Sequence, residues 1–149
     1  MFQIAGHLPE EEYQVVLIGV SGKQQKRLPP NVIGISPTND EDELAAYYSL
    51  ASVFVNPTYE DNFPSTNLEA LACGTPVITY KTGGSPEAID PRTGVVVEKG
   101  DIDSLINATL SIRKESCTAA CRERAVTCFN KDLCFDNYIH LYDELMTKD

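Results

Sequence analysis

Two acidic residues eight positions apart, followed by two adjacent glycines, are the part of this sequence best suited to chemistry. Glu69 lies about one turn inside an expected helix, where its carboxylate can accept two hydrogen bonds from a vicinal diol such as a ribose. The start of that helix, at residues 65–67, offers free backbone N–H groups and the positive end of the helix dipole, which favour a phosphate group. Gly83 and Gly84 allow a ligand to approach the backbone closely. Asp61, in the polar loop before the helix, is the second candidate acid.

The same residues also have plain structural explanations. The helix dipole alone favours an acid such as Glu69 near a helix start, and two glycines form a turn in most proteins. Residues 40–43 are all acidic, and we interpret them as the solvated start of a helix rather than as a metal site. Cys117 and Cys121 are four apart, but no His or acid pair accompanies them at ligand spacing. We therefore interpret them as reduced thiols.

Short β-branched runs alternate with helix-forming segments along most of the chain. Such alternation predicts an α/β fold with an open, doubly wound parallel sheet and right-handed crossovers. From residue 101 onward only helical periodicity remains, so we expect a helical carboxy-terminal tail that packs back on the sheet. Ligands of this architecture bind outside the carboxyl ends of the strands. The expected strands cover residues 13–19, 32–35, 52–57, 76–80 and 95–98.

Particular side chains are expected to begin, end and orient the helices. Ser65 or Thr66 is expected to cap the helix that holds Glu69, and Gly74 to end it in a left-handed conformation. The run Ser85-Pro86-Glu87 is typical of an N-cap, a first-position proline and a first-turn acid. The helix that begins at residues 40–43 is expected to turn four side chains inward: Leu44, Ala45, Tyr48 and Leu50.

The length, charge and hydropathy of the chain argue against several classes of function. The chain has 149 residues, enough for one domain, and its 12 basic and 22 acidic side chains give a net charge of −10. Binding to a nucleic acid backbone relies on clustered Lys and Arg, so this balance argues against such a partner. No run approaches the roughly 18 apolar residues of a membrane span, and no leader-like segment follows Met1. We expect a cytoplasmic protein with reduced cysteines.

The segment from Asn56 to Tyr80, with the following Gly83-Gly84-Ser85-Pro86-Glu87, resembles a known family. It is similar to the nucleotide-sugar-binding half of retaining glycosyltransferases of family 4, the glycosyl transferases group 1. Their signature is an acid, seven residues and a glutamate, here Asp61 and Glu69, continued as Leu-Glu-Ala-x-Ala-Cys-Gly-Thr-Pro-Val. The resemblance implies one Rossmann-like lobe of a GT-B fold.

The resemblance also implies roles for the site residues. Glu69 would bind the ribose diol of the nucleotide, and Asp61 would face the transferred sugar. Glu60 would take the role of Asp61 only if the loop shifts by one residue. Gly83 and Gly84 would border the donor. Backbone N–H groups would bind the donor sugar at Asn62, Phe63 and Ser65, and the diphosphate at Thr66, Asn67 and Leu68.

The sequence departs from the family pattern in several places. Asp61 stands where the family usually has Glu, and Pro64, which lacks an N–H, stands at a position often held by Gly. The family opens this domain with a strand, a Gly-Arg pair and a downstream Lys that neutralise the leaving diphosphate, and carries its acceptor site on an amino-terminal domain. Neither precedes Met1. Loss of such a clamp reduces the rate by on the order of a hundredfold or more, so the fragment is expected to be inactive alone.

The beginning of the chain bears on its domain organisation. Phe2, Ala5 and Leu8 are spaced like the last turns of an amphipathic helix, with no strand before them. We expect residues 1–149 to form a single carboxy-terminal-type domain without its first strand and without the acceptor domain. A short free-standing helix at the start is the alternative.

The resemblance implies transfer of a sugar from a nucleoside diphosphate of the UDP or GDP type to a saccharide or lipid-linked acceptor, as in polysaccharide biosynthesis. It implies neither a metal nor a cofactor besides the nucleotide-sugar co-substrate, and peripheral membrane association is conceivable for the full enzyme. An apolar face left uncovered by the missing parts would favour a homo-oligomer. Two alternatives remain open. One is a non-catalytic nucleotide-binding or subunit-interaction module, and the other is a sugar-nucleotide epimerase of the same fold.

Overall fold

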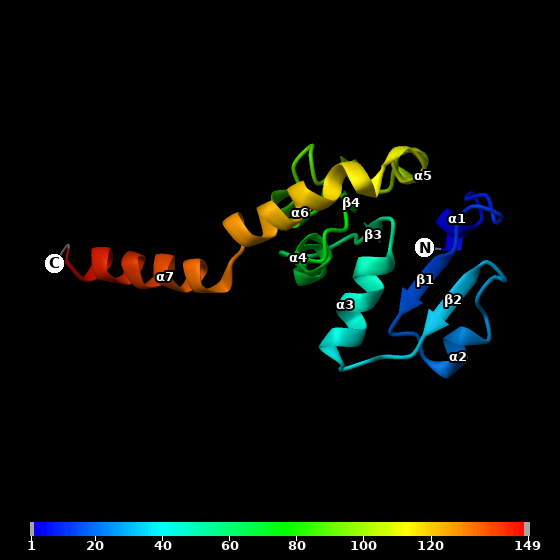
Figure 1. Ribbon diagram of the computed structural model, residues 1–149, viewed down its shortest axis with the longest axis horizontal. Coiled ribbons are helices and arrows are strands. Elements are labelled where there is room, and N and C mark those ends of the chain that lie inside the picture. Colours follow the sequence, from blue (N-terminus) through cyan, green and yellow to red (C-terminus); the bar gives the residue numbers. More distant parts are fainter. Residues whose placement is uncertain (1, 148–149) are drawn as a thin grey trace.

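Parallel strands and helices alternate in the computed structural model, which describes residues 2–147 (Figure 1). Each expected strand is present, with ends that differ from the expected ones by at most two residues, and the α/β class with a helical carboxy-terminal tail is confirmed. The strands are β1 (Val15–Ile18), β2 (Val32–Ile35), β3 (Phe54–Asn56), β4 (Val77–Tyr80) and β5 (Gly94–Val97). The helices are α1 (Phe2–Ala5), α2 (Gly22–Gln25), α3 (Glu41–Leu50), α4 (Ser65–Ala72), the 3₁₀ helix η1 (Ser85–Ala88), α5 (Ile102–Ser111), α6 (Lys114–Cys128) and α7 (Lys131–Met146).

Hydrogen bonds join the strands into two parallel ladders. In one, β1 pairs with β2, with Val15 opposite Val32. In the other, β3, β4 and β5 lie in that order, with Phe54 opposite Val77 and Val77 opposite Gly94. Gly94 is required there, because an added Cβ would lie 1.9 Å from the carbonyl oxygen of Val77.

The core of the molecule is centred on β4, all four residues of which are buried. Successive side chains of a strand point to opposite faces, and the two faces of β4 are covered by different helices. Ile78 and Tyr80 join a cluster that includes Leu105 of α5, whereas Val77 joins a cluster with Leu71 of α4 and residues of α6. The sheet formed by β3, β4 and β5 is therefore covered on both faces at β4, as in a doubly wound fold.

Helix α3 begins as expected and presents fewer side chains to the core than expected. The carboxylate of Asp40 caps it by accepting hydrogen bonds from the N–H groups of residues 42 and 43. Tyr48 is buried and Leu44 is half-buried, but Ala45 is exposed and Leu50 is 82% exposed. The prediction for Ala45 and Leu50 is therefore wrong, because the helix contacts the core along a narrower stripe than its apolar residues suggested.

The amino-terminal segment packs onto the core. Ala5 and Leu8 are buried, and the side-chain amide of Asn31 donates a hydrogen bond to the carbonyl oxygen of Ala5. The side chain of Phe2 lies outside the described residues. Within those residues, no helix is both long and apolar enough to cross a membrane.

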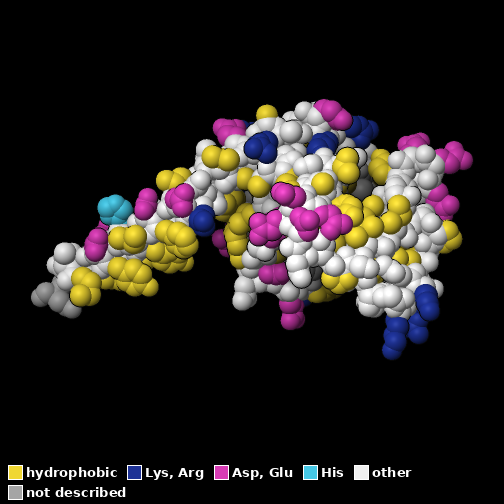
Figure 2. All heavy atoms as spheres, turned by 60° about the horizontal axis from the view of Figure 1, so that its bottom comes forward, with side chains coloured by type: hydrophobic (Ala, Val, Ile, Leu, Met, Phe, Trp, Pro, Cys, Tyr) yellow, Lys and Arg dark blue, Asp and Glu magenta, His cyan; other side chains and the backbone are white. Residues whose placement is uncertain are grey.

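Helix α7 extends away from the rest of the molecule (Figure 1). Helix α5 packs back on β4 and β5 as expected, and α6 packs against α4, but no residue of α7 is buried within the described part of the chain. Phe135, Tyr138 and Tyr142 of α7 are 58%, 62% and 65% exposed, so the expectation that the tail packs back on the sheet is wrong for its last helix. Hydrophobic side chains lie along one side of α7 and acidic ones along the other (Figure 2). Amphipathic spacing predicted the helix but not what it contacts.

Candidate functional site

The carboxyl ends of β3, β4 and β5 surround an open hollow of about 350 Å³. Loops after these strands form its walls, which is where a doubly wound fold places ligands. The hollow includes three of the predicted loop residues, Glu60, Asp61 and Asn62, together with Gly83. The remaining lining residues are Tyr59, Lys81, Thr82 and Lys99.

The two lysines of the hollow were missed in the sequence analysis. Lys81 Nζ lies 3.0 Å from Glu98 Oε1, and Lys99 Nζ lies 5.4 Å from the centre of the Tyr59 ring. Both lysines are exposed, so each interaction is weak and either side chain is free to meet an anion. Their position directly after β4 and β5 was the available signal, because ligands meet strands at these ends.

The second part of the predicted site is the start of α4. Pro64, not Ser65 or Thr66, occupies the N-cap position, and no side chain caps the helix. The cap prediction is therefore wrong. The first N–H groups of a helix have few partners within it. The N–H of Asn67 donates to the carbonyl oxygen of Pro64 at 3.1 Å, in a tight first turn. Ser65 and Thr66, the first two residues of α4, are exposed. The helix ends at Gly74 with φ +76°, as expected.

Glu69 is half-buried, and both oxygens of its carboxylate accept a hydrogen bond. The Ser65 hydroxyl donates to Oε1 at 3.1 Å, and the Tyr48 hydroxyl donates to Oε2 at 3.1 Å. Burial raises the pKa of Tyr48 well above its ordinary value, and the charge of Glu69 and the hydrogen bond to it raise that pKa further. Tyr48 therefore stays protonated and donates at any physiological pH. Sequence reasoning placed Tyr48 in the core and missed this contact.

Asn67 lies in the first turn of α4 and is fully buried. Its side-chain oxygen accepts a hydrogen bond of 2.9 Å from the Asn56 amide at the end of β3. Its own amide nitrogen and the hydroxyl of Ser85 are both buried, and neither has a hydrogen-bond partner among residues 2–147.

Gly83 and Gly84 lie directly against the loop that holds Asp61. A Cβ added at Gly83 would lie 1.8 Å from the carbonyl oxygen of Asp61, and one at Gly84 would lie 2.3 Å from that of Asn62. The N–H of Gly84 donates to the Asn62 carbonyl oxygen at 2.7 Å. Gly83 also has φ +48°, which favours glycine. The glycines thus allow the loop of residues 61–62 to pack onto the turn.

The predicted site residues form two neighbouring groups rather than one cluster. Asp61, Asn62, Glu60 and Gly83 line the hollow, which does not include Glu69. Gly84 lies against Phe63, two residues before α4, and the ring centres of Phe63 and Phe129 are 5.9 Å apart. Leu68 is half-buried beside Glu69. The loop of residues 60–64 thus links the two groups.

Arg124 of α6 holds the segment that follows the glycine turn. Its guanidinium donates 2.7 and 2.8 Å hydrogen bonds to the carbonyl oxygens of Ala88 and Glu87, and lies 3.3 Å from Asp90 Oδ2. The same group lies 5.6 Å from the ring centre of Phe129. A charged, planar donor with several partners fixes η1 to α6, because each bond constrains the same rigid group.

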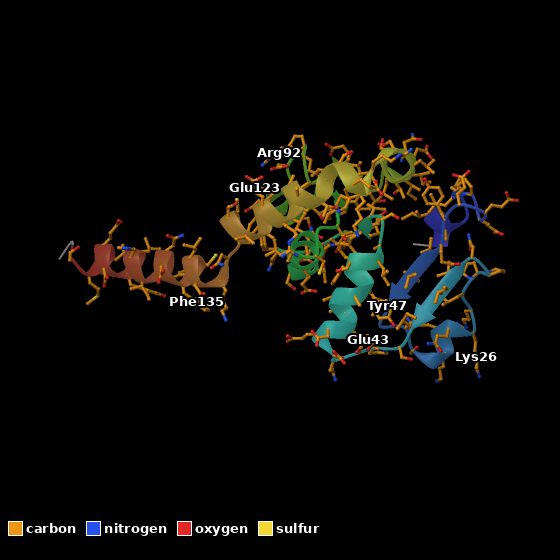
Figure 3. All side chains as sticks on the ribbon, in the orientation of Figure 1. Lys26, Glu43, Tyr47, Arg92, Glu123 and Phe135 are labelled. Atoms are coloured by element: carbon orange, nitrogen blue, oxygen red, sulfur yellow. The ribbon has the colours of Figure 1, made fainter. Side chains whose placement is uncertain are left out.

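Asp90 is the acid that Arg124 contacts, and its pKa is lowered. Burial raises that pKa, but the Arg92 backbone N–H and the charges of Arg124 and Arg92 outweigh burial. Arg92 also reaches across to Glu123 of α6, with 3.2 Å between Nη1 and Oε2 (Figure 3). Among residues 2–147, no group of three or more His, Cys, Asp or Glu side chains is placed to hold a metal ion.

Comparison with known proteins identifies similar chains. A family model described as glycosyl transferases group 1 matches residues 2–115. The D-inositol 3-phosphate glycosyltransferase of Streptomyces bingchenggensis (strain BCW-1) is 46% identical over 68 residues, which cover 45% of this chain and 15% of that protein. The protein of the same name from Arthrobacter sp. (strain FB24) is 36% identical over 100 residues, which cover 60% of this chain and 24% of that protein.

A solved structure gives the likeness in three dimensions. Sucrose-phosphate synthase from Thermosynechococcus elongatus matches with a TM-score of 0.79 and 28% identity, over 99% of this chain and 42% of that chain. The chain thus spans less than a quarter of the two curated relatives and about two fifths of the solved structure.

Proposed function

We propose, from the premise that the chain belongs to the glycosyl transferases group 1 family, that it is the donor-binding, carboxy-terminal domain of a retaining glycosyltransferase of family 4. The full enzyme would transfer a sugar from a nucleoside diphosphate to a saccharide or lipid-linked acceptor. The two curated relatives are named as glycosyltransferases, which supports transfer as the reaction class.

The observation that carries this proposal is the geometry of Glu69. Its carboxylate is half-buried near the start of α4 and is held by two hydroxyl donors, one on each oxygen. Each oxygen keeps a free lone pair, so the group can accept a bidentate pair of hydrogen bonds from a ribose diol. A nucleotide held there would have its diphosphate near the N–H groups at the start of α4, where the helix dipole favours negative charge.

Donor-sugar binding follows from the neighbouring hollow. In our proposal the sugar extends from the diphosphate toward Asp61, with backbone groups of Asn62, Phe63 and Ser65 around it. Lys81 and Lys99 line the same hollow and supply positive charge in a chain whose net charge is −10. They would attract an anionic donor without contacting its ribose.

The strand order supports the proposed domain organisation. In a doubly wound sheet of the usual order, the first strand lies in the middle, with the second strand on one side and the fourth on the other. In this chain, β1 and β2 correspond to the second and third strands of that order. Strands β3, β4 and β5 correspond to its fourth, fifth and sixth strands. The place between β1 and β3 has no strand among residues 2–147. We propose that a central strand and an acceptor-binding domain outside these residues complete the enzyme, and that this chain alone transfers sugar very poorly.

Calorimetric titration with UDP and GDP tests the proposal. Wild-type chain is expected to bind one of them, and Glu69→Ala to bind it at least about tenfold more weakly, because hydrogen bonds to a charged group contribute about 1.5–3 kcal/mol. Glu43→Ala is the matched control, because Glu43 is also near a helix start and also accepts a hydrogen bond from a tyrosine, Tyr47. No binding by the folded wild type, or equal binding by Glu69→Ala, would contradict the proposal.

A further inference from the structure

A buried tyrosine on another helix contacts the carboxylate proposed to bind ribose. We propose that Tyr48 is a positioning residue which, together with Ser65, fixes the Glu69 carboxylate so that one acceptor position on each oxygen is presented to the ribose diol. This inference rests on the proposed function and adds a specificity determinant to it. Tyr48 precedes Glu69 by 21 residues, so the contact depends on the packing of α3 against α4.

The count of acceptor positions carries the inference. A carboxylate has about four acceptor positions, two on each oxygen. Tyr48 occupies one on Oε2 and Ser65 occupies one on Oε1. The two that remain belong to different oxygens, as two adjacent hydroxyl groups require. Without Tyr48, rotation of the carboxylate would be limited by Ser65 alone, and the bidentate arrangement would have to be ordered when the ligand binds.

The Tyr48 ring is itself held in place by contacts that do not involve Glu69. Tyr48 is 7% exposed, and its ring packs edge-on against Phe54 of β3, with 5.3 Å between ring centres. The backbone carbonyl oxygen of Tyr48 accepts a 2.5 Å hydrogen bond from the hydroxyl of Thr75. About one turn after Tyr48, the carbonyl oxygen of Ala51 accepts a 2.9 Å hydrogen bond from Lys114 Nζ. This bond attaches the end of α3 to the start of α6. Such support is what makes a site rigid.

The adjacent tyrosine provides an internal comparison. Tyr47 donates a 3.0 Å hydrogen bond to Glu43 within α3, on the surface of the molecule and outside the site (Figure 3). Tyr47 and Tyr48 therefore make the same chemical contact, a phenol with a carboxylate. Only the contact of Tyr48 joins two elements of the proposed site.

The experiment measures discrimination between a ribonucleoside diphosphate and its 2′-deoxy form. Calorimetry on Tyr48→Phe is expected to give about three- to tenfold weaker binding of the ribo form, and less than about a twofold change for the 2′-deoxy form. The ratio of the two affinities should therefore fall. A merely structural role would weaken both forms equally. Tyr47→Phe should leave both affinities and their ratio unchanged.

The outcomes separate this inference from the proposed function. If the wild type binds neither UDP nor GDP, or if Glu69→Ala binds as the wild type does, the proposed function fails. If Glu69→Ala loses binding but Tyr48→Phe keeps the wild-type ratio, this inference alone is overturned. Phenylalanine keeps the contact with Phe54, and circular dichroism checks the fold. Should Tyr48→Phe not fold, Ser65→Ala decides in its place. Ser65 is exposed and donates to the other oxygen, so an unchanged ratio there overturns the inference.

Discussion

Substitution of Gly84 by alanine tests whether the glycine turn sets the position of the loop that holds Asp61. Gly84 has φ −87° and ψ 3°, outside the left-handed region that favours glycine, so the substitution acts chiefly through contacts. The added Cβ would lie 2.3 Å from the carbonyl oxygen of Asn62 and 3.0 Å from Cδ2 of Phe63. Ordinary contacts are near 3.4 Å, so the loop must retreat by roughly 1 Å.

The expected cost follows from this displacement. Overpacking of this kind destabilises a protein by about 1–3 kcal/mol, and each kcal/mol lowers Tm by about 2–4 °C at this chain length. The 2.7 Å hydrogen bond from Gly84 N–H to Asn62 would stretch or break. A shift of about 1 Å in the groups around the donor sugar should weaken sugar-nucleotide binding by roughly tenfold or more.

Thermal unfolding and calorimetry on Gly84→Ala measure both effects. Gly22→Ala is the matched control, because a Cβ at Gly22, in helix α2, meets no atom within 4 Å. That control should leave Tm unchanged or slightly raised, since alanine reduces the entropy of the unfolded chain. A Gly84→Ala variant with the Tm and sugar-nucleotide affinity of the wild type would refute the packing argument.

Two further predictions concern stability. Leu71→Ala, in the fully buried side of α4, should lower the free energy of unfolding by about 2–5 kcal/mol in urea titration, whereas Leu133→Ala on exposed α7 should change it by less than about 0.5 kcal/mol. An equal loss in both variants would show that α7 is packed. The lowered pKa of Asp90 means that its carboxylate stabilises the fold above its unfolded-state pKa near 3.8, and that this contribution is lost as pH falls through the lower folded pKa. The stability difference between wild type and Asp90→Asn should therefore be constant at neutral pH and shrink below about pH 4, and a difference that grows on acidification would contradict this assignment.

Local sequence signals predicted the strands and several helix ends. The β-branched runs gave all five described strands because each run is short and bounded by Gly or Pro. Asp40 begins α3 and Gly74 ends α4 as expected, since caps depend on residues within one turn. The same logic failed at Ser65. Its hydroxyl bonds to Glu69, and Pro64 takes the N-cap position.

Features that depend on distant residues could not be predicted in the same way. The contact of Tyr48 with Glu69 requires α3 to pack beside α4, which no spacing along the chain encodes. The apolar face of α7 was expected to be buried, but no residue of this helix is buried among those described. An amphipathic pattern predicts a helix with an apolar face and does not specify which surface covers that face. The lysines of the hollow are separated by 18 positions and meet only through the parallel pairing of β4 with β5.

A crystal structure of this chain with whichever of UDP or GDP it binds would show whether Glu69 binds the ribose diol of a nucleotide at the start of α4. We expect both ribose hydroxyls within about 3.2 Å of the two Glu69 carboxylate oxygens, with Tyr48 and Ser65 still donating to them. We also expect the diphosphate to lie against the first N–H groups of α4. A nucleotide whose ribose lies away from Glu69, for example wholly within the hollow lined by Lys81 and Lys99, would contradict this role of Glu69.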